Sequence, residues 1–331
     1  MKVTHVLLVF IFLTIFNACN KIKLNKIPVA DAGPAQTIQL SVDSVTLTGS
    51  GTDEDGFING YLWSKVSGPN IPSIFTPGES STKINHLIAG TYLFQLMVVD
   101  DDGATGLDTV SVSVLPSLIT TLTLQPGPAE GADARLTDVQ NCTPPGNPFL
   151  NLPNSNDPDF QDMPVAAWTN DANGCATMQH RSFLKFTALN NIPQTATILS
   201  AKLSLYGVTS SPSLPQGNSY YPGSPYNSWG TNECWLKQVS GSWSESVITW
   251  NNQPAVTETN RVAIPASTSQ WGYDVQDIDV TNMVKDMVNN ATNNGFCIML
   301  QNEVYYRSVS FASSDNTNAA KRPKLVITYQ E

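Results

Sequence analysis

The hydrophobic positions of this chain fall into two patterns. Residues 6–16 form an almost unbroken apolar run that follows the positive charge of Lys2. Beyond that run, short stretches of alternating apolar and polar residues are separated by clusters of Gly, Pro, Ser, Asn and Asp. Alternation of this kind is typical of β-strands joined by turns. The pattern therefore predicts an all-β chain behind a short hydrophobic leader.

The leader is too short to cross a membrane. It spans about ten residues, whereas a membrane helix needs about 20, so it is interpreted as the central part of a secretory signal. The signal ends on Ala18 and Cys19, which resembles the cleavage site of bacterial lipoproteins. The resemblance implies a signal peptide at residues 1–18, acyl chains on Cys19 and a lipid-anchored protein of the cell envelope. Asn20 after the cysteine favours the outer membrane, and ordinary secretion is the alternative.

Residues 19–26 form a short basic tether, and residues 27–116 have the pattern of a β-sandwich. Strands are expected at residues 44–48, 58–63, 92–99 and 109–115. The acidic segments 53–56 and 100–103 combine Asp with Gly, which suits tight turns. Alternate carboxylates would also suit calcium. Because the remaining ligands of a calcium loop are missing, we expect turns and no bound metal.

Several motifs in this segment occur together and in order. They are Val-Ala-Asp-Ala-Gly at 29–33, Leu-Thr-Gly-Ser-Gly-Thr-Asp-Glu-Asp-Gly at 47–56, Tyr-Leu-Trp at 61–63, Gly-Thr-Tyr at 90–92 and Val-Asp-Asp-Asp-Gly at 99–103. In this combination the segment resembles the PKD domains. The resemblance implies an immunoglobulin-like sandwich that serves as a spacer or adhesive module, with Trp63 packed in its core.

Residues 117–331 form a second, larger β-unit. Strands are expected at residues 118–124, 182–186, 198–208, 234–239, 273–280, 296–300, 309–312 and 325–329. One helix is predicted after Thr281, its expected cap, because Met283, Val284, Met287 and Val288 fall on one helical face. Many strands with a single short helix predict a jelly-roll β-sandwich.

Ordered motifs also run through this second unit. They lie at residues 124–128, 133–134, 181–186, 201–206, 243–254, 279–281, 307–308, 311–314 and 321–325. Together they resemble the DNRLRE domain. The resemblance implies a jelly roll akin to carbohydrate-binding modules, some of which are associated with uronic-acid polymers such as alginate. It implies a polysaccharide partner, and binding far more than catalysis.

The composition narrows the function further. Only 13% of the 331 residues are charged and the net charge is −10, which argues against a nucleic-acid partner. No Gly-x-Ser-x-Gly elbow, zinc-spaced pair or phosphate-binding glycine loop occurs, so we expect neither a cofactor nor an enzyme. His180 has no obvious serine or cysteine partner, and Asp274, Asp277 and Asp279 are interpreted as a solvated strand face. A polysaccharide lyase or hydrolase is the least favoured alternative.

Apart from Cys19, four cysteines remain, an even number that suits disulfides in a secreted chain. Four cysteines allow three pairings. We expect Cys142–Cys175 and Cys234–Cys297, because the last two lie in strand-like segments. Metal binding is the weaker interpretation, since no pair has the close spacing of a zinc site.

The candidate ligand-binding residues are mainly aromatic, because sugars present apolar CH faces that stack on rings. A Pro/Gly/Ser-rich loop at 207–233 is long enough to suggest a function. The candidates are Tyr220, Tyr221, Tyr226 and Trp229 in this loop, Tyr306 and Arg307 in a second cluster, and Trp168. The alternative is that these rings fold onto the sandwich as a small core. Arg181, Lys185 and Arg307 could pair with an acidic glycan or with neighbouring carboxylates.

These expectations combine into a non-catalytic, membrane-anchored surface protein. Its C-terminal jelly roll would bind a polysaccharide, with uronic-acid polymers as one candidate class, and the PKD-like domain would act as a spacer. The alternative is a structural or adhesive surface protein whose partner is another protein.

Overall fold

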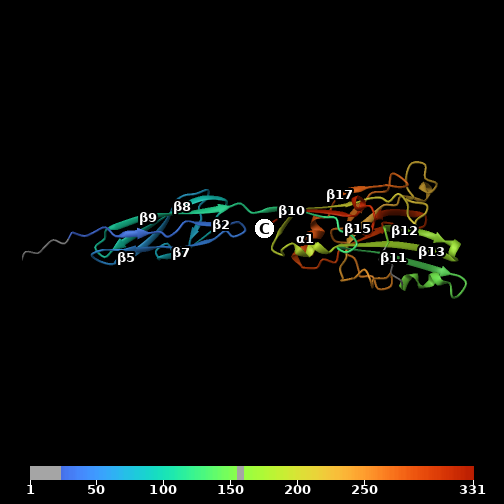
Figure 1. The fold of residues 1–331 in the computed structure, drawn as a ribbon, viewed down its shortest axis with the longest axis horizontal. Coiled ribbons are helices and arrows are strands. Elements are labelled where there is room, and N and C mark those ends of the chain that lie inside the picture. The colour runs from blue at the N-terminus through green and yellow to red at the C-terminus, as the bar shows by residue number, and fades with distance from the viewer. Residues whose placement is uncertain (1–23, 155–159) are drawn as a thin grey trace, which may run out of the picture. The chain divides into compact units, whose positions relative to one another are not determined.

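The computed structural model describes residues 24–154 and 160–331, and the chain divides into two compact units, Met1–Pro116 and Ser117–Glu331 (Figure 1). The predicted signal peptide, Cys19 and most of the tether lie outside the described residues. Within the described part, none of the helices has the length and apolar character needed to cross a membrane.

The N-terminal unit is an immunoglobulin-like sandwich. One sheet has the strand order β2 (Gln36–Gln39), β9 (Thr105–Leu115), β8 (Gly90–Asp100) and β5 (Ile58–Ser67). The facing strands are β3 (Val45–Thr48), β7 (Ser81–Asn85) and β6 (Ser73–Ile74), and β1 (Val29–Asp31) pairs with β4 (Ser50–Thr52). All pairs are antiparallel except β2 with β9. The four strands expected in this segment are all present.

The core of this unit is built around Trp63. Its side chain is 2% exposed and packs with Tyr92 and Phe94, which are fully buried. The indole Nε1 donates a hydrogen bond of 3.1 Å to the carbonyl of Glu79, so the polar end of the ring is satisfied inside the core. The expected core position of Trp63 is therefore confirmed.

The acidic segment 100–103 forms a turn, and the segment 53–56 forms a bend. Asp100 is 1% exposed, and its Oδ1 accepts hydrogen bonds from the backbone N–H groups of Asp102 and Ala104, at 3.0 and 2.8 Å. Gly103 has a φ of 91°, a conformation that glycine adopts without steric cost. The carboxylate of Asp100 thus holds the β8–β9 turn in place.

The C-terminal unit is a β-sandwich of two sheets. The smaller sheet has the order β10 (Ile119–Leu124), β20 (Lys324–Gln330), β14 (Thr197–Leu205) and β17 (Val275–Asp279). The larger has the order β16 (Val262–Ile264), β15 (Cys234–Gln238), β18 (Phe296–Leu300), β13 (Cys175–Phe186), β12 (Asp162–Asn170) and β19 (Arg307–Ala312). An additional strand, β11 (Gly131–Cys142), pairs with β13.

The larger sheet forks at β13, a strand of 12 residues. On one edge β13 pairs with β11 along its length. On the other edge it pairs with β18 near its C-terminal end and with β12 near its N-terminal end. The sequence indicated only the last five residues of β13 and missed β11 and β12.

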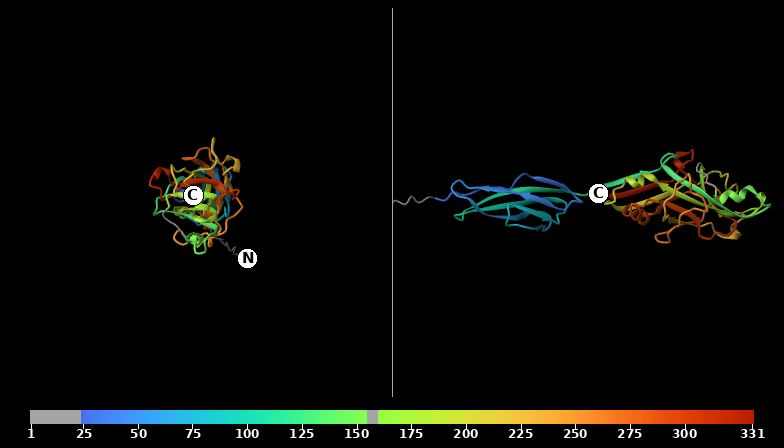
Figure 2. Two further views of the ribbon diagram at one scale, coloured as in Figure 1. Left: turned by 90° about the vertical axis from the view of Figure 1, so that its right-hand side faces the viewer. Right: turned by 90° about the horizontal axis from the view of Figure 1, so that it is seen from below.

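The main core lies between the two sheets, and helix α1 (Thr281–Asn289) contributes its apolar face to it. Met283, Val284, Met287 and Val288 are buried, as the sequence predicted. The expected cap at Thr281 is wrong: Val280 occupies the N-cap position, and the Thr281 hydroxyl accepts a hydrogen bond from Ala201 N–H at 2.9 Å. The helix lies at the end of the unit that holds the C-terminus (Figures 1 and 2).

The long loop between β14 and β15 covers the open edge of β19. The backbone N–H groups of Ser308 and Ser310 donate to the Ser219 hydroxyl and the Asn218 side-chain oxygen, each at 3.0 Å. Ser219 N–H returns a bond of 2.9 Å to the Ser308 carbonyl. Side chains of the loop therefore replace a neighbouring strand, which satisfies the edge and fixes the loop.

One of the two expected disulfides is present. Cys142 and Cys175 are paired residues of β11 and β13 and are joined by a disulfide. The expected Cys234–Cys297 bridge is wrong, because both are free and buried. In the β15–β18 ladder Cys297 lies opposite Lys237, three positions from Cys234, so the two side chains point to opposite faces. Burial raises the pKa of both thiols, that of Cys297 to about 12.

Candidate functional site

Five aromatic rings gather at one end of the C-terminal unit, and we call this group the aromatic platform. It consists of Trp168, Tyr226, Trp229, Tyr305 and Tyr306. Tyr306 is central: its ring centroid lies 4.7 Å from that of Trp229, 5.2 Å from that of Trp168 and 6.1 Å from that of Tyr226. Trp168 and Tyr226 meet edge to face at 4.8 Å. Such geometries are the favourable ones for aromatic pairs.

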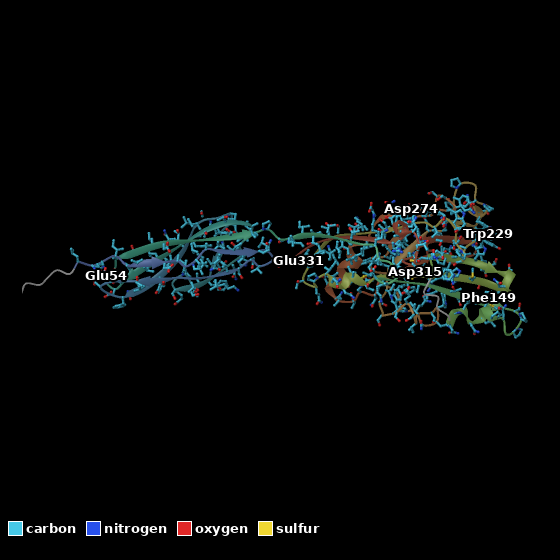
Figure 3. All side chains as sticks on the ribbon, in the orientation of Figure 1. Glu54, Phe149, Trp229, Asp274, Asp315 and Glu331 are labelled. Atoms are coloured by element: carbon cyan, nitrogen blue, oxygen red, sulfur yellow. A yellow bond between two sulfur atoms is a disulfide. The ribbon has the colours of Figure 1, made fainter. Side chains whose placement is uncertain are left out.

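The platform is assembled from three segments that are far apart in sequence. Trp168 lies near the end of β12, Tyr226 and Trp229 lie in the 206–233 loop, and the two tyrosines precede β19. Trp229 is 52% exposed and Tyr305 is 41% exposed, whereas the other three rings are half-buried. Trp229 lies at the opposite end of the unit from Glu331 (Figure 3). The platform therefore offers apolar ring surface to solvent.

Arg307 connects the loops that carry the platform through hydrogen bonds to their backbones. Its side chain is buried, and the guanidinium donates to three backbone carbonyls: Thr231 at 3.0 Å, Val304 at 3.1 Å, and Trp229. Gly230 permits this contact, because its φ is 109° and a Cβ there would lie 2.5 Å from the guanidinium. Arg307 thus connects the platform's two loops, and its contact with a ligand stays a prediction.

The two tyrosines before β19 do not alternate as strand residues would. Tyr306 has a φ of 63° and lies in the loop ahead of the strand, which begins at Arg307. In an extended strand, adjacent side chains point to opposite faces, so only one of Tyr305 and Tyr306 could face outward. With the backbone in the left-handed region, both rings join the platform, 6.4 Å apart. The exposed Tyr305 was thus missed as a candidate.

Tyr220 and Tyr221 lie outside the platform. Both are half-buried, and neither ring has an aromatic partner among the described residues. They act through their backbones instead: the Tyr220 carbonyl accepts from the Ser267 hydroxyl at 2.6 Å, and the Tyr221 carbonyl accepts from the Asn227 amide at 2.8 Å. The structure thus separates them from Tyr226 and Trp229, although all four lie in one loop.

The other two cations considered for an acidic ligand are also engaged. Arg181 forms a two-pronged ion pair with Glu303, with both N–O distances 2.8 Å. Burial lowers the pKa of Arg181 while Glu303 raises it, and the net shift is upward. Lys185 donates to the Trp243 carbonyl at 3.0 Å. Arg181 is thus committed to the protein's own groups, and Lys185 uses one of its three donors on the Trp243 carbonyl.

The titratable groups considered for catalysis are also held in structural roles. His180 is buried beside the Thr137 hydroxyl at 3.0 Å, and burial together with the charge of Arg135 lowers the pKa of His180 to about 3. The imidazole is therefore neutral at physiological pH and shielded from solvent. Asp279 pairs with Lys202 at 2.7 Å, and this hydrogen bond lowers the pKa of Asp279.

A cluster of carboxylates lies elsewhere in the same unit. Asp133, Glu245 and Asp315 each place an oxygen within 4.8 Å of the others. Asp133 is 3% exposed and its Oδ2 accepts from the backbone N–H of Ser314 at 2.8 Å and from its hydroxyl. Burial raises the pKa of Asp133 to about 7. A carboxylate cluster alone does not define a metal site, but this one makes folding sensitive to pH.

Comparison with known proteins assigns both units to classes. Residues 32–114 match a family model of the PKD domain, and residues 165–329 match that of carbohydrate-binding module family 96. All five platform residues lie within the second match. The two segments are thus similar to a PKD domain and to a carbohydrate-binding module, which are both non-catalytic kinds of domain.

Individual relatives share a limited part of the chain. It is 38% identical over 90 residues to the "Dyslexia-associated protein KIAA0319-like protein" of Mus musculus, covering 27% of this chain and 9% of that protein. It is 35% identical over 94 residues to "Low-density lipoprotein receptor-related protein 11" of Homo sapiens, covering 28% and 19%. The chain therefore spans less than a fifth of either relative.

Two solved structures are also similar to parts of the fold. The solution structure of the PKD domain from KIAA 1837 protein is 35% identical, covers 28% of this chain and 92% of its own, and has a TM-score of 0.26. A carbohydrate-binding module of the β-sandwich superfamily is 10% identical, covers 93% of this chain and 100% of its own, and has a TM-score of 0.22.

The role of Arg307 yields a stability prediction. Arg307→Ala removes three charge-assisted hydrogen bonds to carbonyls. Because bonds made by one side chain do not add independently, we expect a loss of roughly 2 to 4 kcal/mol in unfolding free energy. Trp229→Ala, a change at an exposed ring, should cost less than about 1 kcal/mol. Urea denaturation of the full chain measures both. Equal stability of the wild type and Arg307→Ala would contradict the role of Arg307 in holding the two loops of the platform.

The burial of Asp133 yields a pH prediction. The unfolded carboxyl ionises near pH 4 and the folded one near pH 7, so the folded state binds more protons between these values. Stability should therefore fall as the pH rises from 4 to 7, by an amount on the order of 4 kcal/mol from this group. Asp133→Asn should remove this component of the pH dependence.

The measurement is chemical denaturation at pH 4.5 and 7.5 with a chelator present, so that no cation offsets the charge. Asp138→Asn is the matched control, because Asp138 lies on the same strand and is only half-buried. If Asp133→Asn and the wild type lose the same stability between the two pH values, the prediction fails.

Proposed function

We propose that this protein is a lipid-anchored component of the cell envelope that binds a polysaccharide through the aromatic platform. The observation that carries the proposal is the platform itself: five rings from three segments, two of them well exposed, inside the segment that matches a carbohydrate-binding module. Rings arranged in this way stack on the apolar CH faces of sugars, while adjacent amides and hydroxyls bind the sugar hydroxyls.

The proposal assigns the PKD unit the role of a spacer. The chain enters the C-terminal unit at β10, which pairs with β20 so that Ile119 lies opposite Gln330. Trp229 lies at the other end of the same unit from Glu331 (Figure 3). Within the C-terminal unit, the platform is therefore remote from the end at which the chain enters.

The charge pattern favours neutral polymers over uronic-acid polymers as the ligand. An acidic glycan needs cations with free hydrogen-bonding capacity. Of the three cations considered for this purpose, Arg181 is paired with a carboxylate and Arg307 donates to three backbone carbonyls, whereas Lys185 donates to one. Uronic-acid polymers remain the second class of ligand to be compared directly in the binding experiment.

The platform is tested by affinity electrophoresis of the full chain without its signal against cellulose derivatives, xylan, laminarin and alginate. We expect one polymer class to retard the wild type, and Trp229→Ala to reduce this affinity about fivefold or more, because stacking on one ring is worth about 1 kcal/mol or more. Tyr221→Ala is the matched control and should bind as the wild type does, because its ring lies outside the platform.

Retention that Trp229→Ala leaves unchanged would reject the platform as the binding site. If none of the four polymers retards the protein, polysaccharide binding is rejected. The alternative, an adhesive surface protein whose partner is another protein, is then favoured.

The anchor gives a separate prediction. We expect the expressing bacterium to incorporate an alkyne-tagged fatty acid into the wild-type chain and not into Cys19→Ser, because acylation requires the thiol. The variant should also move from the membrane fraction to the soluble fraction, since stable anchoring depends on the acyl chains. Equal labelling of both chains would exclude Cys19 as the lipid attachment site, and separation of inner and outer membranes tests the expected outer-membrane location.

A further inference from the structure

A polar groove of about 630 Å³ lies at the other end of the strand that carries Trp168. Asp162, the first residue of β12, forms part of its wall, and Trp168 lies six positions further along the same strand. Six of the thirteen lining residues carry amide or hydroxyl side chains. They are Gln161, Thr209, Ser210, Asn316, Thr317 and Asn318. Groups of this kind exchange hydrogen bonds with hydroxyl-rich ligands.

Asp162 supplies an unusual acceptor in the wall. The residue is 3% exposed, and its Oδ2 accepts from the hydroxyls of Ser211 and Ser310, the second at 3.1 Å. Its Oδ1 is buried and has no hydrogen-bond partner among the described residues. A buried acceptor without a donor costs about 1 to 3 kcal/mol. Because this oxygen is buried, Asp162 orders the groove wall through Ser211 and Ser310 and leaves the contact with a ligand to the exposed side chains around it.

The charges on the other wall cancel. Lys321 Nζ lies 3.0 and 3.1 Å from the two carboxylate oxygens of Asp274, and both side chains are about one-third exposed. Because the ammonium is matched by a carboxylate, this wall presents polar hydrogen-bonding groups without a net charge. Such a surface suits a neutral, hydroxylated ligand better than an anion.

The exposed side chains of Thr209 and Ser210 are free to serve a ligand. Neither side chain forms a hydrogen bond within the described part of the protein, whereas neighbouring Ser211 is committed to Asp162 and to the Leu214 N–H. They lie in the same loop that carries Tyr226 and Trp229. This loop is fixed to β19 at Asn218 and Ser219, between the groove and the platform.

The groove and the platform are held at a fixed separation. Six residues of extended β12 span roughly 20 Å, at about 3.3 Å per residue. Asp274, which binds the groove residue Lys321, lies between Glu331 and Trp229 along the length of the unit (Figure 3). A ligand chain that extends from the platform toward the middle of the unit would therefore meet the groove.

We propose that this groove is a second subsite for the same polysaccharide and takes the hydroxyls of a neutral sugar unit, while the platform stacks on another unit of the same chain. The inference rests on the proposed function and deepens it. The ligand is then the interior of a neutral chain that is long enough to reach both sites. Simultaneous contact makes the second binding event intramolecular, so the affinity rises once the chain spans the separation.

The test is isothermal titration of the full chain without its signal against cello-, xylo- and laminari-oligosaccharides of two to eight sugars. Mannuronate oligosaccharides of the same lengths are the charged comparison. For a neutral series, wild-type affinity should rise at least about tenfold between the shortest and longest ligands. Ser210→Trp, which fills the groove, should abolish this rise and keep the affinity for the shortest ligand.

Two further variants separate loss of the subsite from loss of the fold. The double change Thr209→Val and Ser210→Ala removes two hydroxyls without adding bulk and should also reduce the gain with length. Ser246→Trp is the matched control at an exposed serine that is neither in the groove nor in the platform, and should retain the full gain. The melting temperature of each variant verifies folding.

The outcomes distinguish the two proposals. Affinity that is independent of length, or a gain that survives in both groove variants, overturns the second subsite. If Trp229→Ala still abolishes binding in that case, the platform stands alone. A gain seen only with mannuronates overturns the neutral specificity of the groove. Absence of binding by every series overturns the platform, and with it the subsite that depends on it.

Discussion

The buried guanidinium of Arg307 is the contact on which the candidate site depends. Three backbone carbonyls, from Trp229, Thr231 and Val304, converge on one planar cation. Because a guanidinium donates in several fixed directions within one plane, it fixes both loops relative to β19 at once. Exposed rings on unsupported loops would lose conformational entropy on binding; rings held in this way are already positioned, so less of the binding energy is offset.

The contacts of the loop with the edge of β19 also hold the platform in position. A loop of the length of 206–233 is expected to be mobile, yet Asn218 and Ser219 bind the β19 backbone where another strand would otherwise pair. The same contacts prevent β19 from pairing with a second chain. One segment therefore closes the sheet, carries Tyr226 and Trp229 to the platform, and contributes Thr209 and Ser210 to the groove. The platform and the groove therefore share residues of one loop.

The sequence predicts well the strands and helices that have one buried face and one face exposed to solvent. Trp63 and the α1 stripe at Met283 and Met287 follow simple periodicity and are found where expected. β11 and β12 were missed because both of their faces are covered, so buried polar residues such as Asp133 and Asp162 interrupt the alternation. Period-based reasoning detects amphipathic elements and has little to detect in strands of this kind.

The site shows a second limit of the same reasoning. The sequence identifies Trp168, Tyr226, Trp229 and Tyr306 as candidates by residue type, but it also includes Arg307, which is a structural cation here. Two tertiary facts separate these roles: the left-handed backbone at Tyr306 and the open space that Gly230 leaves for the guanidinium. Neither follows from composition, because a cation that binds an acidic ligand and one that binds carbonyls are the same residue type.

The internal partners of the cationic side chains also affect which kind of ligand the unit would bind. Arg181 is neutralised by Glu303, Lys321 by Asp274, and Arg307 by carbonyl dipoles. An acidic polymer would have to displace these internal partners and would expose Glu303 or Asp274 to its own negative charges. A neutral polymer incurs neither cost and gains from the apolar rings and the uncharged amides. With a net charge of −10 on the whole chain, long-range electrostatics also oppose a polyanion.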